Sequence, residues 1–250
     1  MSTDLARELQ AIKPGTDPSP LRGFEYVRGF GIFSFPFDSG QVLALRVFPQ
    51  NDFAPYRTVW YRTPDGAWSI FVDGPRIDTA CPRYYGAAVK ASTRAAITLT
   101  WTGPMTLSVH MDAPELIWEV TMIEPPLVRM MNAISGAMPE WLWRTPAMLR
   151  TFERVGGRLF DLGDITLSGR LPNGHFGILM PRRMFPIGSA SARFAGVDLG
   201  RGVRVPINPS IGELRLPARP TFAVGGAYFE IRDAEEYERT IHELRSGWPQ

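Results

Sequence analysis

A regular alternation of apolar and polar side chains runs through residues 97–101, 105–111 and 115–122. Successive side chains of a β-strand point to opposite faces, so this alternation predicts antiparallel strands that share one apolar face. The side chains predicted on that face are Ile97, Leu99, Trp101, Met105, Leu107, Val109, Met111, Leu116, Trp118, Val120 and Met122. The opposite, solvated face is expected to carry Thr98, Thr100, Thr106, Ser108, His110, Glu119 and Thr121.

The first connection sets the expected register of these strands. A three-residue loop at 102–104 would pair Leu99 with Leu107 and Trp101 with Met105.

Turn signals divide most of the remaining chain into further hairpins. In YRTPDGAWSI, residues 61–70, Pro64 fixes φ and Gly66 supplies the left-handed position of a tight turn. Further strands are predicted at residues 30–37, 42–48, 56–62, 67–73, 165–171, 175–180, 184–194 and 222–231. About ten strands joined by tight turns predict a mainly β protein, an antiparallel meander closed into a barrel.

Residues 125–157 interrupt the hairpins with apolar side chains at three- and four-residue steps, the spacing of a helix. Pro125-Pro126 and Thr145-Pro146 suit first helical turns, whereas Gly136 and Gly156-Gly157 are expected to end helices. The sequence thus predicts two helices joined by residues 139–144. Their charged residues give the pair a wet face, so we expect a cap that hinges across one end of the barrel.

Shorter helices are predicted at both ends of the chain. Leu5, Leu9 and Ile12 are spaced for one amphipathic helix, and Asp233 is expected to cap another that runs to Arg245. The expected organisation is an N-terminal helix and linker, residues 1–22, followed by one barrel domain, residues 23–250, that includes the insert.

Composition excludes several classes of function. The net charge is only +2 and the basic residues are scattered, so no nucleic-acid partner is expected. The only cysteine, Cys81, cannot form an internal disulfide, and no run of about 18 apolar residues suggests a membrane span. The first residues lack the apolar segment of a signal peptide, and we expect a cytoplasmic protein.

The hairpins YRTPDGAWSI and TLTWTGPMTLSV resemble the turn-punctuated strands of lipocalin-like (calycin-type) β-barrel proteins of the carotenoid hydratase, or hydroxyneurosporene synthase, type. By pattern the resemblance extends over residues 24–231. It implies a barrel whose interior holds one small hydrophobic ligand.

The irregular segment 78–86, DTACPRYYG, is the expected polar part of a ligand site. Arg83 is predicted to hold a carboxylate or carbonyl oxygen, with Tyr84 and Tyr85 beside it. The alternative is an Asp–Arg pair that ties down the loop while the tyrosines cover the barrel mouth. The strand residues Trp60, Trp101 and Trp118 are expected in the core, which in a hollow barrel forms the pocket wall.

Catalysis would require an acid and a base that converge on the pocket. Asp78, Tyr84, Glu119 and Glu213 are the candidates, and none belongs to a recognisable catalytic motif. His110, His175 and His242 lack metal-ligand spacing, so neither a metal nor another cofactor is expected.

The sequence therefore supports two main hypotheses. The protein binds a hydrophobic small molecule (a lipid, terpenoid or polyketide-like compound) in a barrel cavity under a helical lid, or it is a cofactor-free hydratase, cyclase or isomerase that acts on such a ligand there. A third hypothesis, contact with a membrane surface, depends on Trp141, Trp143, Arg144 and Arg150 in the insert.

Overall fold

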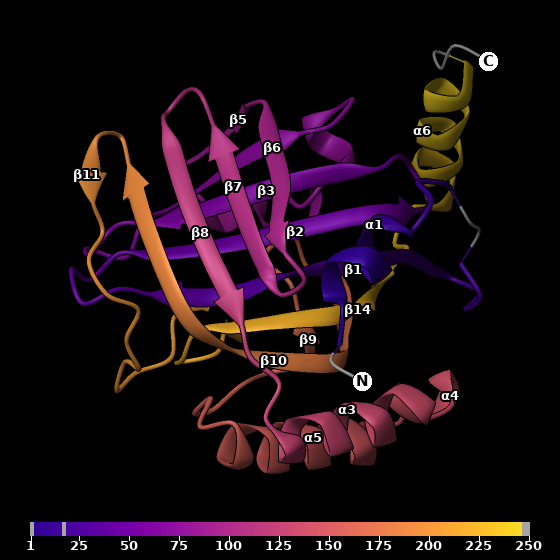
Figure 1. Cartoon of the computed structure of the whole chain (residues 1–250). Helices are drawn as coiled ribbons and strands as arrows, with labels where there is room; N and C mark the ends of the chain where they lie inside the picture. The colour runs from indigo at the N-terminus through magenta and orange to yellow at the C-terminus, as the bar shows by residue number, and fades with distance from the viewer. Residues whose placement is uncertain (1–2, 17–18, 247–250) are drawn as a thin grey trace.

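A strongly curled sheet dominates the computed structural model, which describes residues 3–16 and 19–246 (Figure 1). Ten strands follow one another in the order β5-β4-β3-β2-β1-β14-β10-β8-β7-β6, and every pair except β4–β5 is antiparallel. Their bounds are β1 Phe24–Pro36, β2 Val42–Asn51, β3 Tyr56–Arg62, β4 Trp68–Asp73, β5 Ala91–Arg94, β6 Ile97–Gly103, β7 Thr106–Met111, β8 Leu116–Met122, β10 Phe176–Phe194 and β14 Thr221–Glu230. The short strands are β9 Ser168–Arg170 and β11 Val197–Asp198, which pair with β10, and β12 Ser210–Ile211, which pairs with β13 Leu214–Arg215.

The sheet forms a half-barrel, and the closed barrel expected from the sequence is not what the strand pairing shows. Strands β5 and β6 are the two ends of the path. The segment between β4 and β5 contains the short helices η1 (Ile77–Thr79), α2 (Pro82–Tyr85) and η2 (Gly86–Ala88). It returns the chain parallel to β4, which a meander of tight hairpins cannot do, and the edge strand β5 has only four residues.

Strand β10 joins the two halves of the curled sheet. Its first part pairs with β14, and from Ile187 onward it pairs with β8. Close backbone approach accompanies the coiling: a Cβ on Gly225 in β14 would lie 1.9 Å from the carbonyl oxygen of Met180. Only glycine fits such a position without moving the neighbouring strand.

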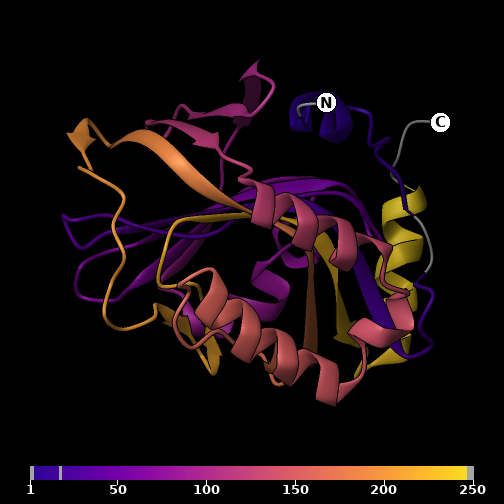
Figure 2. The same ribbon diagram turned by 60° about the horizontal axis from the view of Figure 1, so that its bottom comes forward.

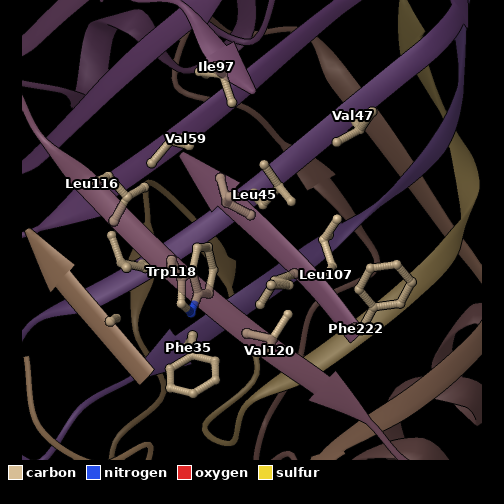
Figure 3. Close-up of a cluster of buried hydrophobic side chains, with 14 of the residues drawn as sticks. Phe35, Leu45, Val47, Val59, Ile97, Leu107, Leu116, Trp118, Val120 and Phe222 are labelled. Atoms are coloured by element: carbon tan, nitrogen blue, oxygen red, sulfur yellow. The ribbon is translucent and has the colours of Figure 1, made fainter. Parts of the chain in front are cut away.

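Side chains from both halves fill the space between them (Figure 3). Trp118 of β8 is fully buried and contacts Phe35 of β1 edge-on, with ring centroids 5.7 Å apart. Tyr61 of β3 stacks on Phe194 of β10 at 4.2 Å. The apolar face predicted from the alternation is confirmed: all eleven side chains belong to this cluster, and Leu99, Trp101 and Met105 are its partly buried members.

The predicted register of the first hairpin is wrong by two residues. Strand β6 continues through Gly103, which pairs with Thr106, so Trp101 lies opposite Leu107. The turn therefore has two residues instead of three, with a bulge before it. A slip of two residues leaves each side chain on its predicted face, because the side-chain period of a strand is two.

Both terminal helices are present where the sequence predicted them. Helix α1 (Leu5–Gln10) buries Leu5 and Leu9 against the sheet. Helix α6 (Ala234–Ser246) follows Asp233, whose carboxylate accepts a hydrogen bond from the backbone N–H of Glu236 at 2.9 Å. None of the described helices is long and apolar enough to cross a membrane.

The insert contains three helices, α3 (Pro126–Ala137), α4 (Glu140–Trp143) and α5 (Pro146–Leu159), instead of two. The prolines stand in first turns as predicted, but Gly136 and Gly156-Gly157 lie inside helices. Figure 2 shows α3 and α5 lying across the sheet, outside its packed interior. They cover a separate apolar cluster that includes Met180 and Tyr228.

Candidate functional site

The polar segment predicted as the head-group site is engaged inside the protein. The Nε of Arg83 donates to the Glu25 carboxylate at 3.1 Å, and its Nη1 donates to Glu236 of α6 at 3.2 Å. The Tyr84 hydroxyl also donates to Glu25, and its ring stacks on Phe229 at 3.9 Å. Arg83 thus connects α2, β1 and α6, and only 11% of its side chain is exposed.

Glu25 is the most perturbed carboxyl of this network. Burial raises its pKa to about 7, although Arg83 and the Tyr84 hydroxyl act in the opposite direction. The gap lined by Glu25, Tyr56 and Tyr84 has a volume of about 0 Å³, which leaves no room for a ligand. The arrangement is that of a buried polar network that links secondary-structure elements.

The six predicted ligand-binding residues are divided between two clusters. Arg83, Tyr84 and Tyr85 lie with Trp60 on one face of the sheet, where the rings of Trp60 and Tyr85 meet at 4.8 Å. Trp101 and Trp118 lie in the interior cluster. The structure therefore does not bring the six together around one cavity.

The catalytic candidates are similarly dispersed. Asp78 is paired with Arg76, Glu119 is exposed on the outer face of β8, and Tyr84 is buried beside Glu25. Cys81 is buried, and burial raises its pKa. The described residues contain no group of three His, Cys, Asp or Glu side chains placed to hold a metal ion.

An apolar cleft with a volume of about 180 Å³ lies between α3 and α5. Met138, Trp143 of α4, strand β10 and the segment after α5 form the rest of its wall. The lining residues are Met131, Asn132, Ile134, Ser135, Met138, Trp143, Thr151, Phe152, Val155, Gly156, Phe160, Ile165, Leu167, Pro181 and Met184. None of these side chains is ionisable.

Trp143 and Phe152 stack within this cleft, with ring centroids 4.2 Å apart and planes at 4°. Trp143 is 1% exposed, and its indole N–H is buried without a hydrogen-bond partner in the structure. Most buried donors in proteins have a hydrogen-bond partner. An unpartnered N–H beside an open cleft is therefore a candidate donor to an acceptor atom of a ligand.

Polar side chains hold α3 onto β10. The Asn132 amide accepts from the backbone N–H of Met184 at 2.8 Å and donates to its carbonyl at 3.1 Å. Arg182 donates to the carbonyl oxygens of Gly136 and Met138 at the end of the helix. Only Val128 and Asn132 of α3 are fully buried, so this wall of the cleft has few apolar contacts beneath it.

A wider groove of about 730 Å³ lies on the other side of α3, toward α1. Its lining includes Arg28, Arg182 and Arg183. Arg183 pairs with Glu8, and Glu140 accepts from Tyr228, so much of its charge serves internal contacts.

The residues of the cleft were not predicted as a site, although the sequence contains a signal for it. The stretch 127–138 has more apolar side chains than one buried stripe of a helix needs, namely Leu127, Met130, Met131, Ile134 and Met138.

Comparison of the chain with protein-family models, curated proteins and solved structures gives no match.

Proposed function

We propose that this protein binds a hydrophobic small molecule in the cleft between α3 and α5. The observation that carries the proposal is a cleft of about 180 Å³ whose lining is almost entirely apolar. A dry apolar cavity of about 150 Å³ is sufficient for benzene, whereas drug-sized ligands occupy roughly 300–1,000 Å³. The cleft therefore suits a ring or a short stretch of acyl or isoprenoid chain, and the rest of a larger ligand would extend through its opening.

The orphaned indole N–H of Trp143 adds a requirement for the ligand. An acceptor such as a carbonyl, ester or hydroxyl oxygen would satisfy this donor in a low-dielectric site. Helix α3 then acts as a lid over this cleft, hinged at Met138-Pro139 after the helix ends. This differs from the expected cap, in which the whole pair, residues 125–157, covers one end of a barrel. The absence of ionisable side chains from the described lining favours a carrier or sensor over the acid–base enzyme.

The test compares two glycines that offer the same chemistry at different places. Gly156 of α5 lines the cleft and Gly136 of α3 lines the polar groove, and a Cβ on either meets nothing within 4 Å. G156L places a side chain in the cleft, while G136L is the matched control. Both remove a helix-interior glycine, so each is expected to stabilise its helix by about 0.5–1 kcal/mol.

The readout is the fluorescence of N-phenyl-1-naphthylamine, a neutral apolar probe. Wild type and G136L should bind it with similar affinity, and G156L should lose about tenfold or more, equivalent to ~1.4 kcal/mol. Equal affinity in all three proteins, or no binding by wild type, would overturn the proposal. Native mass spectrometry with solvent extraction would then identify the natural ligand.

A further inference from the structure

Exposed apolar side chains concentrate on the helical insert. The described residues include eleven large hydrophobic side chains that are exposed, and seven of them lie between residues 123 and 160. They are Ile123, Leu127, Met130, Ile134, Trp141, Val155 and Leu159. Ile134 is 60% exposed and Trp141 is 59% exposed. Single exposed apolar side chains are common, but a concentration of them in one segment marks an interaction surface.

The charges of the insert are sorted by sign. The three carboxylates between residues 123 and 160 all have partners within the protein: Glu124 accepts from Thr3, Asn132 and Arg129, Glu140 accepts from Tyr228, and Glu153 accepts from the backbone N–H of Leu167. The exposed charges of the same stretch are all arginines: Arg150, Arg154 and Arg158 of α5, and Arg129, which pairs with Glu124 at 3.3 Å.

Helix α5 shows how the two kinds of side chain are arranged. Arg150, Arg154 and Arg158 repeat at four-residue steps, and Val155 and Leu159 follow one position later. On a helix these are two adjacent stripes. Val155 and Ile134 of α3 both line the cleft and are exposed, so the apolar stripe follows the rim of the cleft with arginines beside it.

We propose that the outer face of α3–α5 docks on a membrane surface that contains anionic phospholipids. An apolar stripe next to exposed arginines, with every carboxylate partnered within the protein, matches the acyl boundary and the negative head groups of such a surface. Trp141 is suited to the interface because its ring is amphipathic. The membrane-surface hypothesis from the sequence also included Trp143 and Arg144, but Trp143 is buried and Arg144 is half-buried, so they do not belong to this surface.

Vesicle co-sedimentation of the full chain tests this inference independently of any ligand in the cleft. Wild type should bind vesicles of phosphatidylcholine with phosphatidylglycerol, bind phosphatidylcholine alone far more weakly, and dissociate as salt rises from about 0.1 M to about 0.5 M. The triple variant R150Q/R154Q/R158Q should lose about fivefold per arginine, on the order of a hundredfold in all. L127Q/I134Q should also weaken binding.

The matched controls lie on the β10–β11 hairpin, which Figure 1 places away from the insert. Arg193 is exposed there and Val197 is 58% exposed, so R193Q and V197Q should bind vesicles as wild type does. Equal binding to both kinds of vesicle, or equal loss in the controls, would overturn the proposal. Absence of vesicle binding with a concentration-dependent dimer that L127Q/I134Q abolishes would show that a second copy covers this face instead.

Discussion

The substitution Glu25→Gln is expected to remove most of the pH dependence of stability between pH 5 and pH 8. Glu25 is 1% exposed and lies between Arg83 and the Tyr84 hydroxyl. Glutamine has nearly the same shape and still offers the Tyr84 hydroxyl an acceptor, but it cannot ionise. The variant therefore separates the titration of this group from its packing.

The magnitude follows from the pKa of Glu25. Burial raises this pKa from 4.5 to about 7, so the folded protein keeps a proton that the unfolded chain has released. The stabilisation is fully present below pH 4.5 and is lost as the pH rises through 7. A difference of about 2.5 pH units corresponds to about 3 kcal/mol at 1.36 kcal/mol per unit.

The measurement is the free energy of unfolding in urea at several pH values. Wild type should become less stable between pH 5 and pH 8, and E25Q should show a much flatter profile. The E25Q variant should keep a small residual slope because burial raises the pKa of Asp52 to about 6. The double variant E25Q/D52N should remove this residual slope. E238Q, which removes an exposed carboxylate, should retain the wild-type slope. A wild-type stability that increases over this range, or equal slopes in wild type and E25Q, would refute the assignment.

Three further outcomes are expected. W143F should weaken binding of 1-acetylnaphthalene by about 0.5–1.5 kcal/mol more than binding of naphthalene, because only 1-acetylnaphthalene has an acceptor for the indole N–H. The control is W141F, which changes an exposed tryptophan. Equal losses for the two compounds would exclude that hydrogen bond. N132A should destabilise the protein by about 1–3 kcal/mol and speed amide exchange in α3, since both hydrogen bonds to the Met184 backbone are lost. In wild type, amides in 127–155 should exchange faster than those of the sheet strands and slow when N-phenyl-1-naphthylamine binds; protection equal to that of the strands would make the insert a fixed core element.

The sequence predicts the faces of the strands better than their pairing. Burial of an apolar side determines which residues point inward, so the alternation in β6, β7 and β8 identifies the interior cluster. A slip of two residues satisfies the same pattern, and the bulge between Trp101 and Gly103 decides the register. That choice depends on turn geometry, which the alternation does not encode.

Whether the barrel closes depends on segments whose sequences lack the periodicity of a strand or a helix. The chain between β4 and β5 folds into short helices whose positions depend on long-range contacts, such as those of Arg83 with Glu25 and Glu236. Because these contacts are not visible in the local sequence, Arg83 was predicted as a ligand residue. Its partners lie more than fifty residues away in the sequence, and a local reading shows only an arginine beside two tyrosines. We expect R83M to destabilise the fold by about 1.5–3 kcal/mol, the range for hydrogen bonds to charged groups, because Glu25 can take up a proton when its partner is lost.

The insert owes both of its proposed roles to the way in which its polar side chains are used. Asn132 and Ser135 of α3 bond to the backbone of β10, and Glu153 of α5 bonds to the backbone of the following segment. These polar side chains occupy positions against the sheet, where most helices place apolar side chains. Val128, Trp143 and Leu149 are buried, and most of the other apolar side chains face either each other across the cleft or the solvent. A cleft with apolar walls and an apolar outer rim follows from one arrangement, which is why the proposed ligand site and the proposed docking surface share these helices.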